Sequence, residues 1–202
     1  MFAQPTIEIQ LTNTTLENVI IKGNFVLNAK DSLVIKKSAI LENVIIKAPK
    51  VTIAEEFKGS IQVFARLRID VGKKVLLEYP SVLCLYNSTK EKSEIRIREQ
   101  AQLSGGIVLF GNSQKLIDEN KILIEKETEL LGDVYCSGRL MLKGKVNGSI
   151  YTNALFYEAE ASNFDNCIMH TTIDVFNKPE YFVSVPLFAD KLSSYGIIKK
   201  VY

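Results

Sequence analysis

His170 is the only histidine in this 202-residue chain, which removes most metal sites and catalytic triads at once. Cys167 lies three residues before it, with Asp165 and Asp174 nearby, and a Cys–His pair is an arrangement that activates a thiolate nucleophile. In an extended strand, however, positions three apart face opposite sides, so we expect the two side chains not to meet. The sequence therefore predicts no enzyme site here.

Carboxylates, the next candidates, are not paired. Enzymes that cleave polysaccharides on parallel sheets use two or more acids on one face for acid–base work or calcium binding. Here Glu8, Asp70, Glu78 and Asp133 stand singly on different apolar runs. No phosphate-binding loop is present either. The prediction is no catalytic residue, no metal and no cofactor.

The three cysteines, Cys84, Cys136 and Cys167, are odd in number and lack paired spacing. They therefore predict neither a disulfide framework nor a zinc site. Cys84 and Cys136 lie within apolar or alternating runs, which favours small core residues.

Charge is balanced: 25 Lys and Arg against 23 Asp and Glu give a net charge of +2. This balance gives no case for nucleic acid or an anionic membrane surface. No apolar run approaches the roughly 18–20 residues of a membrane span, and no signal peptide is visible. We therefore expect membrane contact only through an anchor outside this chain. The compartment stays open between the bacterial cytoplasm near the envelope and an extracytoplasmic location.

Short Val- and Ile-rich runs with period-two alternation dominate the chain and predict β-strands. The sequence Leu-Glu-Asn-Val-Ile-Ile-Lys occurs twice, beginning at Leu16 and at Leu41. Leu33, Val51 and Ile69 each begin an apolar-x-apolar triplet and are evenly spaced along the chain. Longer steps follow where polar segments at 87–94 and 112–121 predict two surface loops.

Glycine followed two positions later by Ile or Val recurs at Gly59, Gly105, Gly132 and Gly148, which predicts tight corners before strands. Three short strands with corners fit a repeat of about 18 residues, the pattern of a β-helix whose Val and Ile residues stack inside a tube. A sandwich or barrel is the alternative for an all-β chain of this length. Neither alternative predicts a triplet that returns at a constant spacing.

Ten of the 18 Phe and Tyr residues follow Ser149 and obey no such spacing. We therefore expect a β-helix solenoid over 1–153 and an aromatic-rich C-terminal segment over 154–202. That segment either caps the end of the solenoid, which would otherwise expose strand edges, or docks another subunit.

The stretch from Leu130 to Ile150, with Gly-x-Val and alternating apolar positions, resembles the bactofilins, a family of bacterial polymer-forming proteins. This resemblance implies a right-handed β-helix that assembles end to end into filaments without nucleotide, often near the cell envelope.

Two functions are carried forward. The first is a non-enzymatic structural or scaffold protein of a bacterial cytoskeletal or envelope-associated assembly, acting through protein partners and self-association. Its interaction ends would carry Ile7 and Ile9 on one side, and Phe182 and Phe188 on the other. The alternative is a carbohydrate-binding or polysaccharide-processing protein, with aromatic stacking residues at Tyr79, Tyr86 and Tyr135.

Overall fold

The computed structural model describes residues 5–89, 91–111, 119–159, 162–179 and 181–182, which form sixteen strands and no α-helix. The predicted all-β class is confirmed. The strands are β1 (Ile7–Leu11), β2 (Thr15–Leu16), β3 (Ile20–Ala29), β4 (Ser32–Ile35), β5 (Ile40–Ile53), β6 (Lys58–Val71), β7 (Leu76–Asn87), β8 (Ser93–Ile97), β9 (Gln102–Gly111), β10 (Asn120–Ile124), β11 (Glu129–Leu131), β12 (Val134–Leu142), β13 (Lys145–Asn147), β14 (Ile150–Glu158), β15 (Asn163–Asp165) and β16 (Thr172–Ile173).

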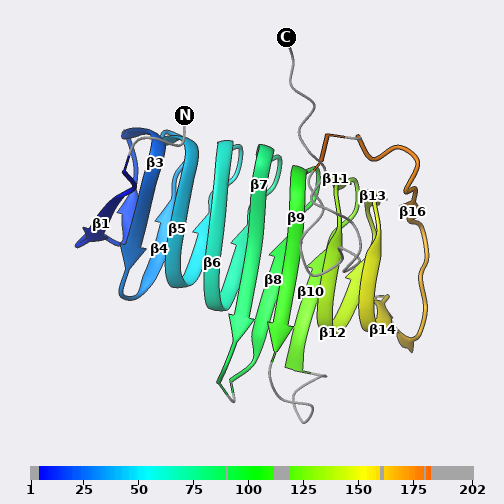
Figure 1. Ribbon diagram of the computed structural model, residues 1–202. Coiled ribbons are helices and arrows are strands. Elements are labelled where there is room, and N and C mark those ends of the chain that lie inside the picture. Colours follow the sequence, from blue (N-terminus) through cyan, green and yellow to red (C-terminus); the bar gives the residue numbers. More distant parts are fainter. Residues whose placement is uncertain (1–4, 90, 112–118, 160–161, 180, 183–202) are drawn as a thin grey trace, which may run out of the picture.

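Six of these strands form a closed ring of parallel neighbours. β6 pairs with β8, β8 with β10, β10 with β12, β12 with β9, β9 with β7, and β7 again with β6. β5, β3 and β1 continue the pairing from β6, so the strands stand side by side from β1 to β14 (Figure 1). Only the β14–β15 pair is antiparallel among the described strands.

The predicted right-handed β-helix, with rungs of about 18 residues, is therefore wrong as a description of this sheet, which is a closed parallel ring with extra strands. The cause is that a constant spacing fixes which residues are neighbours in a parallel pair. It does not fix how the sheet closes. The chain steps between neighbours also vary, because Ile69 pairs with Ile95 and Ile95 with Ile122.

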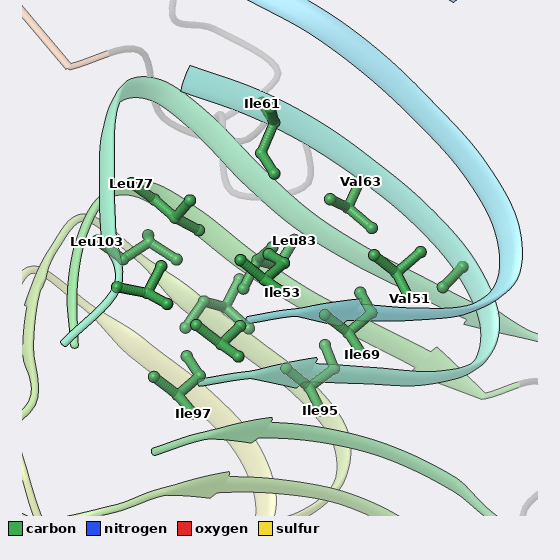
Figure 2. Packing of buried hydrophobic residues seen from close by; sticks show 14 of the residues in the cluster. Val51, Ile53, Ile61, Val63, Ile69, Leu77, Leu83, Ile95, Ile97 and Leu103 are labelled. Atoms are coloured by element: carbon green, nitrogen blue, oxygen red, sulfur yellow. The ribbon is translucent and has the colours of Figure 1, made fainter. Parts of the chain in front are cut away.

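The apolar triplets nonetheless lie in register. Leu33 pairs with Val51, Val51 with Ile69, and Ile122 with Leu140, and all of these side chains are buried. All of them belong to one buried apolar cluster, and the side chains of Val51 and Ile69 point into the space that the strands enclose (Figure 2). At roughly 1.5–3 kcal/mol for each buried Val, Leu or Ile side chain, this apolar interior is the main stabilising term.

Three of the four glycines of the Gly-x-Ile/Val motif stack at one corner, whereas Gly59 pairs with Leu77 and lies elsewhere. A Cβ on Gly105 would overlap the carbonyl oxygen of Ser81, one on Gly132 that of Gly105, and one on Gly148 that of Gly132. Gly105 and Gly132 also have φ of 146° and 139°, a region that side chains disfavour. Glycine is thus required at this corner for two reasons, the close approach of the neighbouring backbone and the positive φ.

A column of alternating charge follows another corner of the molecule. Lys37, Glu55, Lys73, Glu99 and Lys126 each occupy the first position of a two-residue turn between strands. Glu99 Oε atoms lie 3.0 Å from Lys73 Nζ and 3.4 Å from Lys126 Nζ. Hydrogen bonds from these two lysines lower the pKa of the Glu99 carboxyl. Opposite charges in turns that lie side by side favour the observed register over a shifted one.

The predicted division at residue 153 falls inside β14, which is paired with β12 at both Tyr151 and Leu155. Phe156, later in β14, packs on Leu123 and Met141 in a second, smaller apolar cluster. The assignment of 154–202 to a separate cap or docking segment stays a prediction.

Candidate functional site

The first strands of the sheet form a candidate interaction surface, because their outer edges lack a partner strand in the described part of the chain. β1 pairs only with β3, and β2 only with β4. An unpaired edge presents a row of backbone N–H and C=O groups to whatever lies beside it. We call β1 together with the cavity described below the N-terminal edge.

Ile7 and Ile9, both predicted interaction residues, lie on β1 with Leu11 on the same side. Ile7 is 52% exposed, whereas Ile9 and Leu11 are half-buried and pack against the main apolar cluster. Their neighbours on β3 are Phe25, Leu27 and Ala29. On the other side of β1, Glu8 accepts a 2.6 Å hydrogen bond from Asn28 Nδ2.

A cavity of about 620 Å³ opens at this edge. Its apolar lining comes from β1, β2, β3 and the segment between the last two. It is lined by Ile9, Leu11, Leu16, Val19, Ile21 and Leu27, with polar neighbours between them. The apolar interior of the molecule therefore reaches the surface at this edge, because no further described strand covers it.

The opposite end is crossed by the segment 162–179, as the orange trace in Figure 1 shows. β16 pairs with β13, and Asp174 N donates to Val146 O at 2.8 Å. Lys178 Nζ lies 2.5 Å from the carboxylate of buried Asp133. The two ends of the strand series thus differ in how far they are covered.

Phe182, the third predicted interaction residue, is only 8% exposed and packs edge-on against Tyr79, with ring centroids 4.6 Å apart. Tyr181 contacts both rings. The side chain of Phe182 is therefore buried against other residues of this chain and is not exposed for contact with a partner. Phe188 lies outside the described residues.

Of the three tyrosines predicted to stack on carbohydrate, the structure brings two together. Tyr86 on β7 stacks with Phe110 on β9 at 5.9 Å, and Phe110 stacks with Tyr135 on β12 at 6.4 Å. Tyr79 instead belongs to the cluster with Phe182. Phe110 was missed because it lies at the end of an apolar run, where nothing distinguishes an outward ring from a core ring.

The polar residues considered for catalysis are engaged separately. Asp70 is paired with Arg68 and Arg98, and Asp133 with Lys178. Near the histidine, Asp165 is paired with Arg139, and Asp174 accepts from Asn177. Within the described ranges no three His, Cys, Asp or Glu side chains gather as a metal site would require.

Comparisons with known proteins gave no match to a protein family, to a curated protein or to a solved structure. No helix in the described residues is long and apolar enough to cross a membrane.

Cys136 gives a pH-dependent prediction. Burial raises the pKa of its thiol from about 9 to about 11. A folded-state pKa above the unfolded value means that the folded state holds its proton more tightly. The contribution of the Cys136 thiol to the free energy of unfolding is therefore fully present below pH 9. It is lost as the pH rises to about 11, by up to ~2.7 kcal/mol.

Urea unfolding followed at pH 8 and pH 10.5 measures this loss. The Cys136→Ala variant is the control, because it retains every other titrating group. We expect the wild-type loss between the two pH values to exceed that of the variant. Equal losses would show that the thiol does not titrate differently in the two states.

Proposed function

We propose that this protein is a non-enzymatic structural protein that acts through protein–protein contacts at its N-terminal edge. The observation that carries the proposal is the coincidence of an unpaired strand edge with an apolar cavity at one place. Each feature alone is common. Together they offer backbone hydrogen bonds for affinity and side-chain pockets for specificity, which is how an added strand is recognised.

β1 also lacks three of the devices that discourage strand addition, and its one charged side chain is Glu8. Such edges are commonly protected by lysine, by proline or by a bulge. β1 reads Ile7-Glu8-Ile9-Gln10-Leu11, with none of the first two, and its pairing with β3 continues without a register shift. The edge is therefore suited to pairing with another strand.

The cellular setting of this function is inferred from the sequence. Support for a bacterial cytoskeletal or envelope-associated assembly comes from the bactofilin resemblance of the sequence alone. Carbohydrate binding is retained as a second candidate, because Tyr86 and Phe110 are exposed and stacked. Retardation of the protein in a native gel containing a neutral polysaccharide, reduced by Tyr86→Ala, would favour it.

The main proposal is tested by photo-crosslinking from position 8 in cells that produce the protein, with Glu8 replaced by a benzophenone amino acid. We expect adducts that Ile7→Lys reduces about tenfold or more, since a lysine at the contact must be desolvated. Ile173→Lys is the matched control, because Ile173 is similarly exposed (46%) but lies on β16. Absence of adducts, or equal reduction by both variants, would contradict the proposal.

A further inference from the structure

We infer that the partner at the N-terminal edge is a second copy of this chain, whose β1 pairs antiparallel with this β1 about a two-fold axis through Ile9. This inference rests on the proposed function and names its partner. It is drawn from the sequence of β1, from the way its side chains face and from the difference between the two ends.

The sequence of β1 is nearly symmetric about its centre. Antiparallel pairing centred on Ile9 sets Ile7 opposite the second copy's Leu11, and Ile9 opposite its counterpart. A one-residue shift of the pairing would instead oppose apolar and polar residues. Shifts of two residues also keep apolar residues opposite each other but leave part of the strand unpaired, so only the register centred on Ile9 pairs all five residues of β1.

The polar side of the strand is complementary in the same register. Glu8 falls opposite the second copy's Gln10, so a carboxylate acceptor meets an amide donor, twice in each dimer. Asn28 already donates to Oε1 of Glu8 and thereby orients it. No like charges face each other, and like charges directly opposite would destabilise the pair.

The two-fold axis stands perpendicular to the sheet, so Ile7, Ile9 and Leu11 of both copies lie on one side. That side continues the buried row formed by Leu27 and its neighbours on β3. The cavities of the two copies then open toward each other. Residues that are half-buried in one copy become interior in the pair, which supplies the hydrophobic part of the contact.

The assembly closes at two copies. A two-fold contact uses the same surface on both partners and leaves none of it for a third. The other end of the strand series is crossed by the segment 162–179, which is fastened by the Lys178–Asp133 pair. We therefore expect a dimer and not a filament.

Sedimentation equilibrium of three variants tests the register. Gln10→Glu sets two Glu–Glu pairs across the contact, and we expect it to raise the dimer dissociation constant about tenfold at low salt. The double exchange Glu8→Gln with Gln10→Glu restores both pairs and should return the constant to near the wild-type value. Ile173→Lys should leave it unchanged. Both positions in β1 face outward and are exposed, so these exchanges leave the interior intact.

The outcomes separate this inference from the proposed function. A dimer that is weakened by Gln10→Glu and restored by the double exchange supports it. A wild-type protein that is monomeric at high concentration, or a double exchange that fails to restore the dimer, overturns it. If the crosslinks from position 8 then carry a different protein, the proposed function stands with another partner. If they carry none, both fail.

Discussion

Replacing Gly105 by alanine is expected to lower the free energy of unfolding by roughly 2–5 kcal/mol. About 1–2 kcal/mol comes from placing a side chain at positive φ, and a further 1–3 or more from overpacking. The second contribution arises because the new Cβ would overlap the carbonyl oxygen of Ser81, which belongs to the neighbouring strand and cannot rotate away.

Gly23→Ala is the matched control for this experiment. Gly23 also has a positive φ, 98°, but a Cβ there would meet nothing within 4 Å. Its replacement should cost only the backbone contribution, about 1–2 kcal/mol. Urea unfolding followed by circular dichroism measures both variants. Equal losses would mean that close approach at the Gly105 corner is not what requires glycine.

Replacing Asn120 by alanine should lower the free energy of unfolding by about 1–3 kcal/mol. Its side-chain oxygen accepts hydrogen bonds from Asn87 Nδ2 at 3.0 Å and from Ser93 Oγ at 2.6 Å, and all three side chains are buried. Removing the acceptor leaves the buried Ser93 hydroxyl without this partner, at a cost of about 1–3 kcal/mol, whereas Asn87 Nδ2 keeps its hydrogen bond to Glu91 O.

The matched control for Asn120 is Asn153→Ala. Asn153 is exposed and donates one hydrogen bond to Ser137 O, so we expect a loss below about 1 kcal/mol. The same urea titration compares the two variants. A loss at Asn120 no larger than that at Asn153 would show that the buried polar cluster does not contribute to stability.

The strands and much of their register could be predicted from the sequence, whereas the closure of the sheet could not. Evenly spaced residues such as Leu33 and Val51 pair because a constant step brings equivalent side chains into contact. The same step is compatible with any parallel arrangement that repeats it. For this reason the spacing predicted neighbours correctly and the β-helix incorrectly.

The duplicated heptapeptide illustrates the same limit. Equivalent residues of its copies do not pair: the copies meet only out of register, at Ile21–Leu41 and Lys22–Glu42, whereas Val44 pairs with Phe25. What the copies share is a turn. Asn18 and Asn43 both have positive φ, and the backbone N–H of each donates to a serine Oγ. The repeat therefore encodes a corner, because asparagine tolerates the left-handed region.

The column of alternating charge is present in the sequence. Each member follows the start of an apolar triplet at the same distance along the chain, from Lys37 after Leu33 to Lys126 after Ile122. An alternation of sign at those positions was therefore readable. The stack of Tyr86, Phe110 and Tyr135 could not be predicted from the sequence. Phe110 and Tyr135 belong to runs of different composition and meet only through strand pairing.

At the N-terminal edge, the role of Ile7 and Ile9 as interaction residues stays a prediction. Ile7 and Ile9 were named from their position near the start of the chain, and the structure places both on a strand with one unpaired edge among the described strands. The cavity beside them could not be predicted from the sequence, because its lining combines β1 with the segment from Leu16 to Ile21 and with Leu27.

Hydrogen exchange of the β1 amides at several protein concentrations tests the central claim, that this edge is a binding surface, most directly. We predict that the peptide containing residues 7–11 exchanges more slowly as concentration rises, while that containing β16 does not change. The slowing should disappear in Ile7→Lys. Exchange of residues 7–11 that is independent of concentration, and of any partner captured by crosslinking from position 8, would contradict the account.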